Sequence, residues 1–405
     1  MVSALALGLS ACGGTTDPDW DIPQYVEAKT PGLEMFYKGT TMSFASYMQD
    51  LGLVYREAGM IADPYESIAN HGANCVRLQL DMVPFNKFAG TTIDWQTWGR
   101  VLSDAQRAKA RGLQIFLTLK PDYDIFSSDG PTNHNNLPEA WASLDDDKIG
   151  ENLYTWVYER LEALAKEGIY PAIVAVGNEV NLGFLKNRNV VDNSRTGRLL
   201  EYGFKAVREY AALYNPACLI ALHIADPSRA DYAVQAIEQG GGSDYDVLAL
   251  SYYPGKDIGH GSPLGGSFSA MASLFSKPLM VVETAYTFTT GTVDGEYKGD
   301  YCDNAYNSPD WNESLNPTHY SPANARSWLG SLAKDIRRGG GVGLITWGTE
   351  SLPDELNGKV RGHGKGLFTY PASWAYGSTW ENNSYWDFTN NNNLHEGIDW
   401  MLDVQ

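Results

Sequence analysis

Two glutamates stand at the ends of short apolar stretches of the sequence. Glu179 closes the run Ala172–Asn178, and Glu283 closes Leu279–Val282. Such β-branched, apolar runs are typical of parallel strands that are buried on both faces. In a barrel of alternating strands and helices, the active site lies at the carboxyl ends of the strands. A carboxyl pair there suits hydrolysis of a glycosidic bond, in which a retaining enzyme uses one group as acid/base and one as nucleophile, roughly 5–5.5 Å apart.

The rest of the chain predicts the elements that position these glutamates. Apolar runs alternate with amphipathic segments about eight times, and this pattern indicates a (β/α)8 TIM barrel. A doubly wound open sheet is the alternative, but no glycine-rich phosphate or dinucleotide loop follows the first expected strand. The expected strands are Met35–Thr40, Cys75–Leu80, Leu113–Leu119, Ala172–Asn178, Cys218–His223, Val247–Tyr252, Leu279–Glu283 and Val342–Trp347. The expected helices are Trp95–Ala110, Ile149–Glu167, Leu199–Tyr214, Asp231–Gln239 and Asn324–Arg338.

The charge balance excludes some classes of partner. The chain carries 30 Lys and Arg against 49 Asp and Glu, a formal net charge of −19. A field of that sign repels nucleic acid and acidic polymers, whereas an uncharged sugar meets no such penalty. The 12 Trp and 24 Tyr residues also offer aromatic faces on which sugar rings can stack. The composition therefore favours a neutral carbohydrate over a nucleic acid.

The N-terminus predicts export and a lipid anchor. Residues 1–11 are small and apolar, too few to span a bilayer, and resemble the end of a secretory signal. The sequence Leu-Ser-Ala before Cys12 is similar to the lipobox of bacterial lipoproteins, in which that cysteine is lipidated. Residues 12–32 read as a polar tether, and residues 33–405 as one catalytic domain. We expect a protein of the cell envelope, anchored in the outer membrane on its surface or periplasmic face; a cytoplasmic protein with an apolar start is the alternative.

The cysteines predict neither a metal site nor a disulfide framework. Four are present, and their spacing matches no metal-binding pattern. Cys75 and Cys218 lie inside apolar strand-like runs, where a thiol behaves as a small core hydrophobe. Structural roles in the core are therefore expected for both.

The segments around the two glutamates resemble a known family. Val176–Asn181 (VGNEVN) and Val281–Tyr286 (VVETAY) are similar to the acid/base and nucleophile segments of the endo-β-1,4-galactanases of glycoside hydrolase family 53, and the likeness runs over most of residues 35–390. The resemblance implies that Glu179 is the acid/base and Glu283 the nucleophile of a retaining double displacement. The implied substrate is β-1,4-galactan, the type I arabinogalactan of pectin side chains.

The same resemblance implies further contacts in the site. Arg77, on the second strand, would keep Glu283 ionised. Asn178 would bond the 2-hydroxyl of the sugar, where contacts strengthen in the transition state. The remaining substrate-binding candidates are two cleft residues, His223 and Tyr252, and two stacking residues, Trp347 and Trp380. The alternatives are a surface or structural ion pair for Arg77 and a core side chain for His223, Tyr252 and Trp347.

Two positions depart from the family pattern. After the first strand, Thr41 stands where the family has Asp, and after the third strand Lys120 stands where it has His. A related retaining endo-hydrolase acting on another β-linked polysaccharide, such as mannan, xylan or β-glucan, is therefore an open alternative, since substrate choice depends on the loops of a barrel. A non-catalytic surface lipoprotein that binds glycans is a further alternative, and the intact glutamate pair argues against it. A purely structural envelope protein is the last alternative, and the aromatic-rich mouth and the long loop argue against that one.

The long connection Thr284–Pro322 predicts a structural cation. Asp300, Asp303 and Asn304 lie in it, and this stretch loosely resembles the calcium-binding loop of some bacterial galactanases. Carboxylate and amide oxygens are ligands that suit Ca²⁺. A solvated acidic loop is the alternative, and an unchanged melting temperature in EGTA would favour it. Catalysis itself implies no cofactor.

Overall fold

The computed structural model describes the barrel and most of its connections. The described residues are 32–83, 86–88, 91–92, 96–127, 130–186, 190–225, 227, 230–253, 275, 277–289, 320–356, 359–361 and 381–404. The predicted signal, lipobox cysteine Cys12 and tether lie outside these ranges and stay predictions. Among the helices so described, none combines the length and the hydropathy that crossing a membrane demands.

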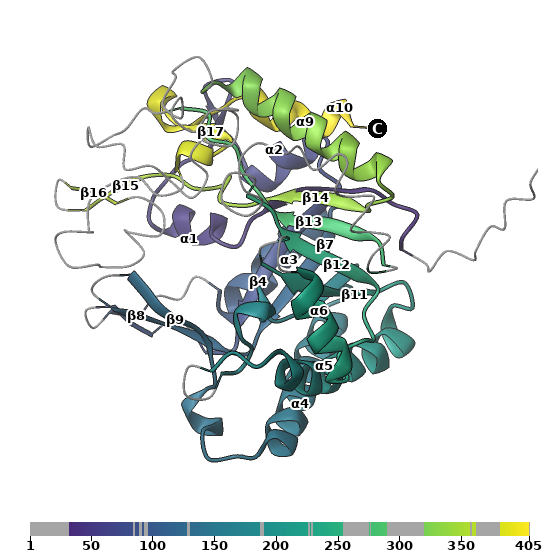
Figure 1. Ribbon diagram of the computed structural model, residues 1–405. Helices are drawn as coiled ribbons and strands as arrows, with labels where there is room; N and C mark the ends of the chain where they lie inside the picture. The colour runs from purple at the N-terminus through teal and green to yellow at the C-terminus, as the bar shows by residue number, and fades with distance from the viewer. Residues whose placement is uncertain are drawn as a thin grey trace, which may run out of the picture.

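A closed parallel barrel forms the centre of the molecule, which confirms the predicted fold (Figure 1). Within the described residues its eight strands pair in chain order, and β14 closes the barrel against β1. They are β1 (Tyr37–Thr41), β4 (Cys75–Asp81), β7 (Gln114–Lys120), β10 (Ile173–Val176), β11 (Leu219–Ile224), β12 (Val247–Ser251), β13 (Leu279–Glu283) and β14 (Gly343–Thr346). Each overlaps a strand expected from the sequence, because runs buried on both faces are apolar throughout.

Helices cover the outside of the barrel, and four of those described begin at side-chain caps. The long ones are α2 (Pro64–Asn70), α3 (Trp98–Ala110), α4 (Asp146–Lys166), α5 (Asn193–Tyr214), α6 (Ala230–Gln239) and α9 (Pro322–Arg338). The side chains of Asp145 and Asp192 accept from backbone N–H groups in the first turns of α4 and α5. Both helices therefore begin before the predicted positions, since capping residues and polar first turns carry no apolar periodicity.

The hydrophobic core has two layers. One fills the barrel, with Tyr37, Cys75, Phe116 and Met280 among its members, and the other lies between the strands and the helices. Cys75 and Cys218 are buried and free, as the sequence predicted. The strands approach closely: a Cβ added at Gly39 would lie 1.8 Å from the Cys75 carbonyl oxygen, so β1 requires glycine there.

Short strands and helices connect the larger elements, and several of them lie beside the carboxyl ends of the barrel strands. The hairpins β8–β9 and β15–β16 lie on the same side of the barrel as α1 (Figure 1). The short strands are β2 (Arg56–Glu57), β3 (Met60–Ile61), β5 (Asn86–Phe88), β6 (Thr91–Thr92), β8 (Tyr123–Ser127), β9 (Gly130–Asn136), β15 (Asp354–Leu356), β16 (Lys359–Arg361), β17 (Trp386–Asp387) and β18 (Asn393–Leu394). The short helices are α1 (Ala45–Asp50), η1 (Glu139–Trp141), η2 (Val180–Leu182), η7 (Glu381–Asn383), η8 (Phe388–Asn390), η9 (Glu396–Asp399) and α10 (Trp400–Asp403).

Candidate active site

A register shift turns Glu283 toward the inside of the barrel. β12 and β13 pair Leu250 with Val281, but the next pair joins Ser251 to Glu283, so one residue is skipped. Because side chains alternate between the two faces of a strand, a shift of one residue exchanges the faces. Met280 and Val282 already point into the barrel core. The irregularity lets Glu283 follow Val282 inward instead of facing the helices, and only 8% of its surface stays exposed.

The guanidinium of Arg77, on β4, connects Glu283 to β7 and to the segment that follows β10. Its Nη1 donates to Glu283 Oε1 at 2.7 Å, and its Nη2 donates to Asn178 Oδ1 at 2.5 Å. The Nε donates to the Thr118 hydroxyl at 3.1 Å. Arg77 is 2% exposed, so this cation is balanced by a buried carboxylate rather than by water. One planar group thereby holds the candidate nucleophile and the residue before the candidate acid/base.

Glu179 follows β10 in an unusual backbone conformation. Its φ of 48° and ψ of 51° lie in the left-handed region, which costs a non-glycine residue about 1–3 kcal/mol. Gly177, at φ 88°, precedes it, and a Cβ there would lie 2.6 Å from a methyl of Val180. Glu179 is partly exposed, at the start of η2. Such strain persists where surrounding contacts enforce it, and it is common at active sites.

His223 supports Glu179 from β11 as a neutral ring. The backbone N–H of Glu179 donates to Nδ1 of His223 at 3.4 Å, and Nε2 of the ring lies 3.0 Å from the Ser251 hydroxyl. Burial lowers the pKa of His223 well below its usual value, and the charge on Arg77 adds to that effect. A neutral ring that accepts at Nδ1 carries its proton on Nε2, so the Ser251 oxygen is the acceptor. His223 thus lies beneath the acid/base segment, 1% exposed.

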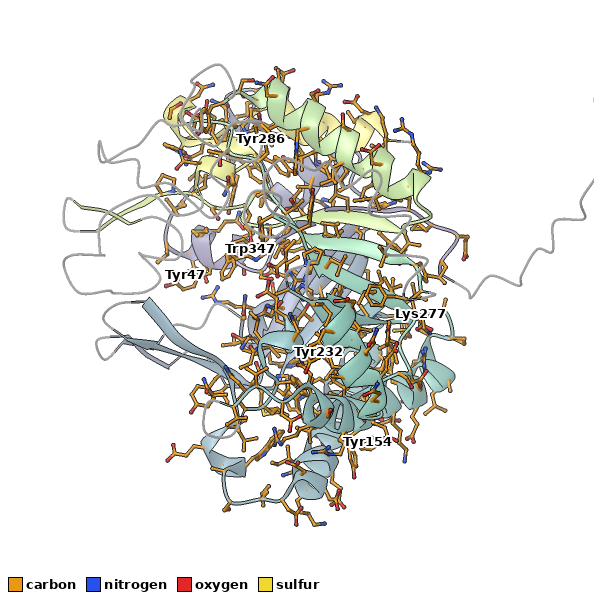
Figure 2. All side chains as sticks on the ribbon, in the orientation of Figure 1. Tyr47, Tyr154, Tyr232, Lys277, Tyr286 and Trp347 are labelled. Atoms are coloured by element: carbon orange, nitrogen blue, oxygen red, sulfur yellow. The ribbon has the colours of Figure 1, made fainter. Side chains whose placement is uncertain are left out.

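The other sequence candidates are divided between the mouth and the core. Tyr252 is 2% exposed, and its backbone N–H donates to the Glu283 carbonyl at 2.7 Å, beside the candidate nucleophile. Trp347 follows β14 and is partly exposed, at the end of the barrel opposite Lys277 (Figure 2). Trp380 and the calcium candidates Asp300, Asp303 and Asn304 lie outside the described residues, so their roles stay predictions.

Both departures from the family pattern lie at buried strand ends. Thr41 is paired in register with Arg77, and Lys120 ends β7. The ammonium group of Lys120 donates to Asp122 at 2.7 Å, and both side chains are buried. Lys120 therefore brings its own counter-ion to the mouth, and the pair adds no net charge there.

Three contributors to the site were not anticipated from the sequence. Thr118 and Ser251 are hydroxyl residues within otherwise apolar strands, and that contrast was a usable signal. Asn135 lies in the β9 strand of a hairpin and donates to three backbone carbonyls of residues 178–183. Nothing local distinguishes it from the asparagines beside it, so only the folded chain reveals the contact.

A further carboxyl group is buried behind the mouth. Glu350 follows β14, is 0% exposed, and accepts a hydrogen bond from Tyr55 through its backbone oxygen. Burial raises the pKa of Glu350 to about 8, although backbone N–H groups and Arg77 oppose the shift. Asp104 on α3, whose pKa burial raises to about 6, adds to the local negative charge. Glu350 is therefore largely protonated at neutral pH.

Glu350 should make the protein less stable in alkali. In the unfolded chain this carboxyl ionises near 4.5, whereas in the folded chain it ionises near 8, so the folded state holds the extra proton between these values. The unfolding free energy must then fall as pH rises through that window. The Gln side chain of Glu350→Gln does not titrate, so the variant lacks this loss of stability. We expect the unfolding free energy of the variant, minus that of the natural protein, to be larger at pH 9 than at pH 5 by on the order of 3–5 kcal/mol. Urea unfolding at both pH values measures this, with exposed Glu201→Gln as control; a pH-independent difference would contradict it.

Comparison with known proteins places the chain in a family. The sequence profile of Glycosyl hydrolase family 53 matches residues 37–401, which include all eight barrel strands of the described chain. The chain belongs to glycosyl hydrolase family 53. It is therefore a glycosidase, and the family resemblance seen in the sequence is confirmed.

The relatives found in these comparisons cover most of the chain. An arabinogalactan endo-beta-1,4-galactanase of Cellvibrio japonicus is 29% identical over 369 residues, 88% of each chain. An endo-beta-1,4-galactanase of Bacillus subtilis is 30% identical over 270 residues, 64% of this chain and 59% of its own. The solved GH53 catalytic domain of Ignisphaera aggregans superposes with a TM-score of 0.70 at 24% identity, covering 91% of this chain and 96% of that one. The last likeness concerns the fold.

Proposed function

We propose that this family 53 enzyme is a retaining endo-β-1,4-galactanase. The names of its relatives support the substrate, galactan of the type I arabinogalactan kind. The observation that carries the mechanism is the Arg77 guanidinium, whose two terminal nitrogens bind Glu283 and Asn178. Because Asn178 directly precedes Glu179, this one rigid group fixes the position of the Glu179 segment relative to Glu283, and the reaction needs both carboxylates.

In the first step, the Glu283 carboxylate attacks the anomeric carbon, and the bond to the leaving sugar oxygen breaks. Glu179, as the acid, gives its proton to that oxygen, so a neutral hydroxyl departs and a glycosyl ester forms on Glu283. In the second step, the Glu179 carboxylate takes a proton from water, whose oxygen attacks the same carbon and releases Glu283. Two inversions leave the anomeric configuration retained.

Contacts around the pair suit an oxocarbenium-like transition state. Asn178 accepts from Arg77 through Oδ1, so its Nδ2 donors are left for the sugar 2-hydroxyl. The Arg77 cation balances the charge of Glu283 in the ground state. Trp347, partly exposed beyond β14, offers an aromatic face to a sugar ring.

Product release from β-1,4-galactan, mannan, xylan and cellulose tests the substrate. The purified protein without residues 1–12 should release short galactose oligomers from galactan alone, and the first product formed should keep the β-anomeric configuration in NMR. Glu283→Ala serves as the blank. Hydrolysis of another polymer instead would be consistent with the same mechanism. It would favour a retaining endo-hydrolase of another β-linked polysaccharide, the alternative that the departures at Thr41 and Lys120 leave open. Folded protein that is inactive on all four would favour a glycan-binding role.

A further inference from the structure

Left-handed backbone residues are concentrated around the proposed acid/base. Among the described residues, six non-glycine positions have positive φ, and three of them surround this segment: Asn135 at 58°, Glu179 at 48° and Leu185 at 47°. Such conformations persist only when neighbouring contacts enforce them. Neighbouring side chains must therefore hold Glu179 in this conformation.

Asn135 reaches the segment from the neighbouring hairpin. Its Nδ2 donates to the Gly183 carbonyl at 2.7 Å and also lies 3.2 Å from the Asn178 carbonyl oxygen and 3.5 Å from that of Glu179. An amide nitrogen has two protons, so one bonds Gly183 and the other is shared between the two remaining oxygens. Asn135 is 3% exposed, and its own carbonyl accepts from the Lys186 N–H at 2.8 Å.

These contacts restrain the two peptide planes on either side of the Glu179 Cα. The Asn178 carbonyl belongs to the plane before that atom, and the Glu179 carbonyl to the plane after it. When both planes are held, the φ and ψ of Glu179 are held as well, and with them the direction of its side chain. The bond from the Glu179 N–H to His223 restrains the first plane from the other side.

We propose that Asn135 is a positioning residue, which orients Glu179 for proton transfer by binding the carbonyls on both sides of it. The inference rests on the proposed role of Glu179 as acid/base. Asparagine suits the place for two reasons. It tolerates the left-handed region in which Asn135 itself lies, and its side chain supplies the donors that three carbonyl oxygens require.

The consequence is specific to acid catalysis. A sugar leaving group must be protonated as its bond breaks, whereas dinitrophenolate is stable enough to leave without a proton. A displaced acid therefore slows cleavage of galactan but hardly affects a dinitrophenyl β-1,4-galactobioside. A general loosening of the site would slow both substrates alike, since the nucleophile acts on each.

Asn135→Gly removes the amide and keeps the left-handed backbone, and Asn135→Asp keeps the shape but sets a carboxylate against three carbonyl oxygens. We expect kcat/KM on galactan to fall on the order of 10–10²-fold in both, and kcat/KM on the dinitrophenyl substrate to change less than about threefold. Azide, which needs no general base, should accelerate turnover of the activated substrate by the variants. Asn136→Gly is the matched control, because Asn136 is also buried and donates to the Tyr123 carbonyl in its own hairpin.

Equal losses on both substrates, or no loss on galactan, would overturn the inference. Should Asn135→Gly fail to fold, Asn135→Asp carries the same test. Glu179→Gln measured alongside separates the two levels of the proposal. If Glu179→Gln does not lose rate on galactan selectively, with little change on the dinitrophenyl substrate, the role of Glu179 itself is wrong. If Glu179→Gln shows this selective loss and the Asn135 variants do not, only the positioning role fails.

Discussion

Glu179→Gln and Glu283→Gln are each expected to lower kcat on β-1,4-galactan by at least about 10²–10⁴-fold. The Glu283 amide cannot form the glycosyl ester, and the Glu179 amide cannot give or take the proton. Both are nearly isosteric, so the contact between residue 283 and Arg77 is weakened rather than lost. Initial rates of reducing-sugar release measure the effect, with circular dichroism to establish that the variants fold.

The two variants should differ from each other on activated substrates. Glu179→Gln retains the nucleophile, so it should still attack a dinitrophenyl galactobioside and respond to azide, whereas Glu283→Gln should do neither. Glu201→Gln is the matched control, because Glu201 is exposed on α5 outside the barrel. A near-natural rate on galactan in either active-site variant would refute the assignment of the pair.

Arg77→Met should lower both stability and activity. It leaves the buried Glu283 carboxylate and the partly buried Oδ1 of Asn178 without the cation that binds them. Breaking a buried pair by removing one partner typically costs about 3–5 kcal/mol, and we expect that loss in the free energy of unfolding. Urea denaturation measures this loss. The kcat on galactan should also fall at least about 10²-fold, because the nucleophile and the acid/base segment lose the group that restrains both.

A double-mutant cycle separates the charge from the packing. In the Glu283→Gln background no carboxylate is left unpaired, so Arg77→Met should cost less stability there than in the natural protein. Arg77→Lys keeps the charge, but the lysine ammonium lacks the planar pair of nitrogens that binds Glu283 and Asn178 together. This variant should therefore lower kcat on galactan while losing less unfolding free energy than Arg77→Met. Arg338→Met, on the exposed end of α9, is the control and should change stability by less than about 1 kcal/mol. Equal costs in both backgrounds would show that the ion pair is not the cause.

The barrel itself was predictable because its signal is local. Each strand buried on both faces is an uninterrupted apolar run, and all eight predicted runs overlap observed strands within the described chain. The starts of α4 and α5 were placed too late, since Asp145 and Asp192 act through caps rather than through periodicity. Thr118 and Ser251 could have been noticed as hydroxyls inside apolar strands.

Other features of the site depend on contacts between distant residues. Arg77 and Glu283 are 206 positions apart, and Arg77 and Asn178 are 101 apart. The skipped residue between β12 and β13, which turns Glu283 inward, depends on how two strands align. The contact of Asn135 with residues 178–183 depends on how a hairpin folds over the next strand. None of these leaves a pattern within one segment of the chain.

Apolar periodicity and a carboxylate at a strand end are properties of single segments, so the barrel and the candidate glutamates can be predicted without a structure. The direction in which those carboxylates point is set only in the folded barrel. Direction depends on register, on the left-handed conformation at Glu179 and on the partners of Arg77, and each of these is set by strands that meet only when the barrel closes.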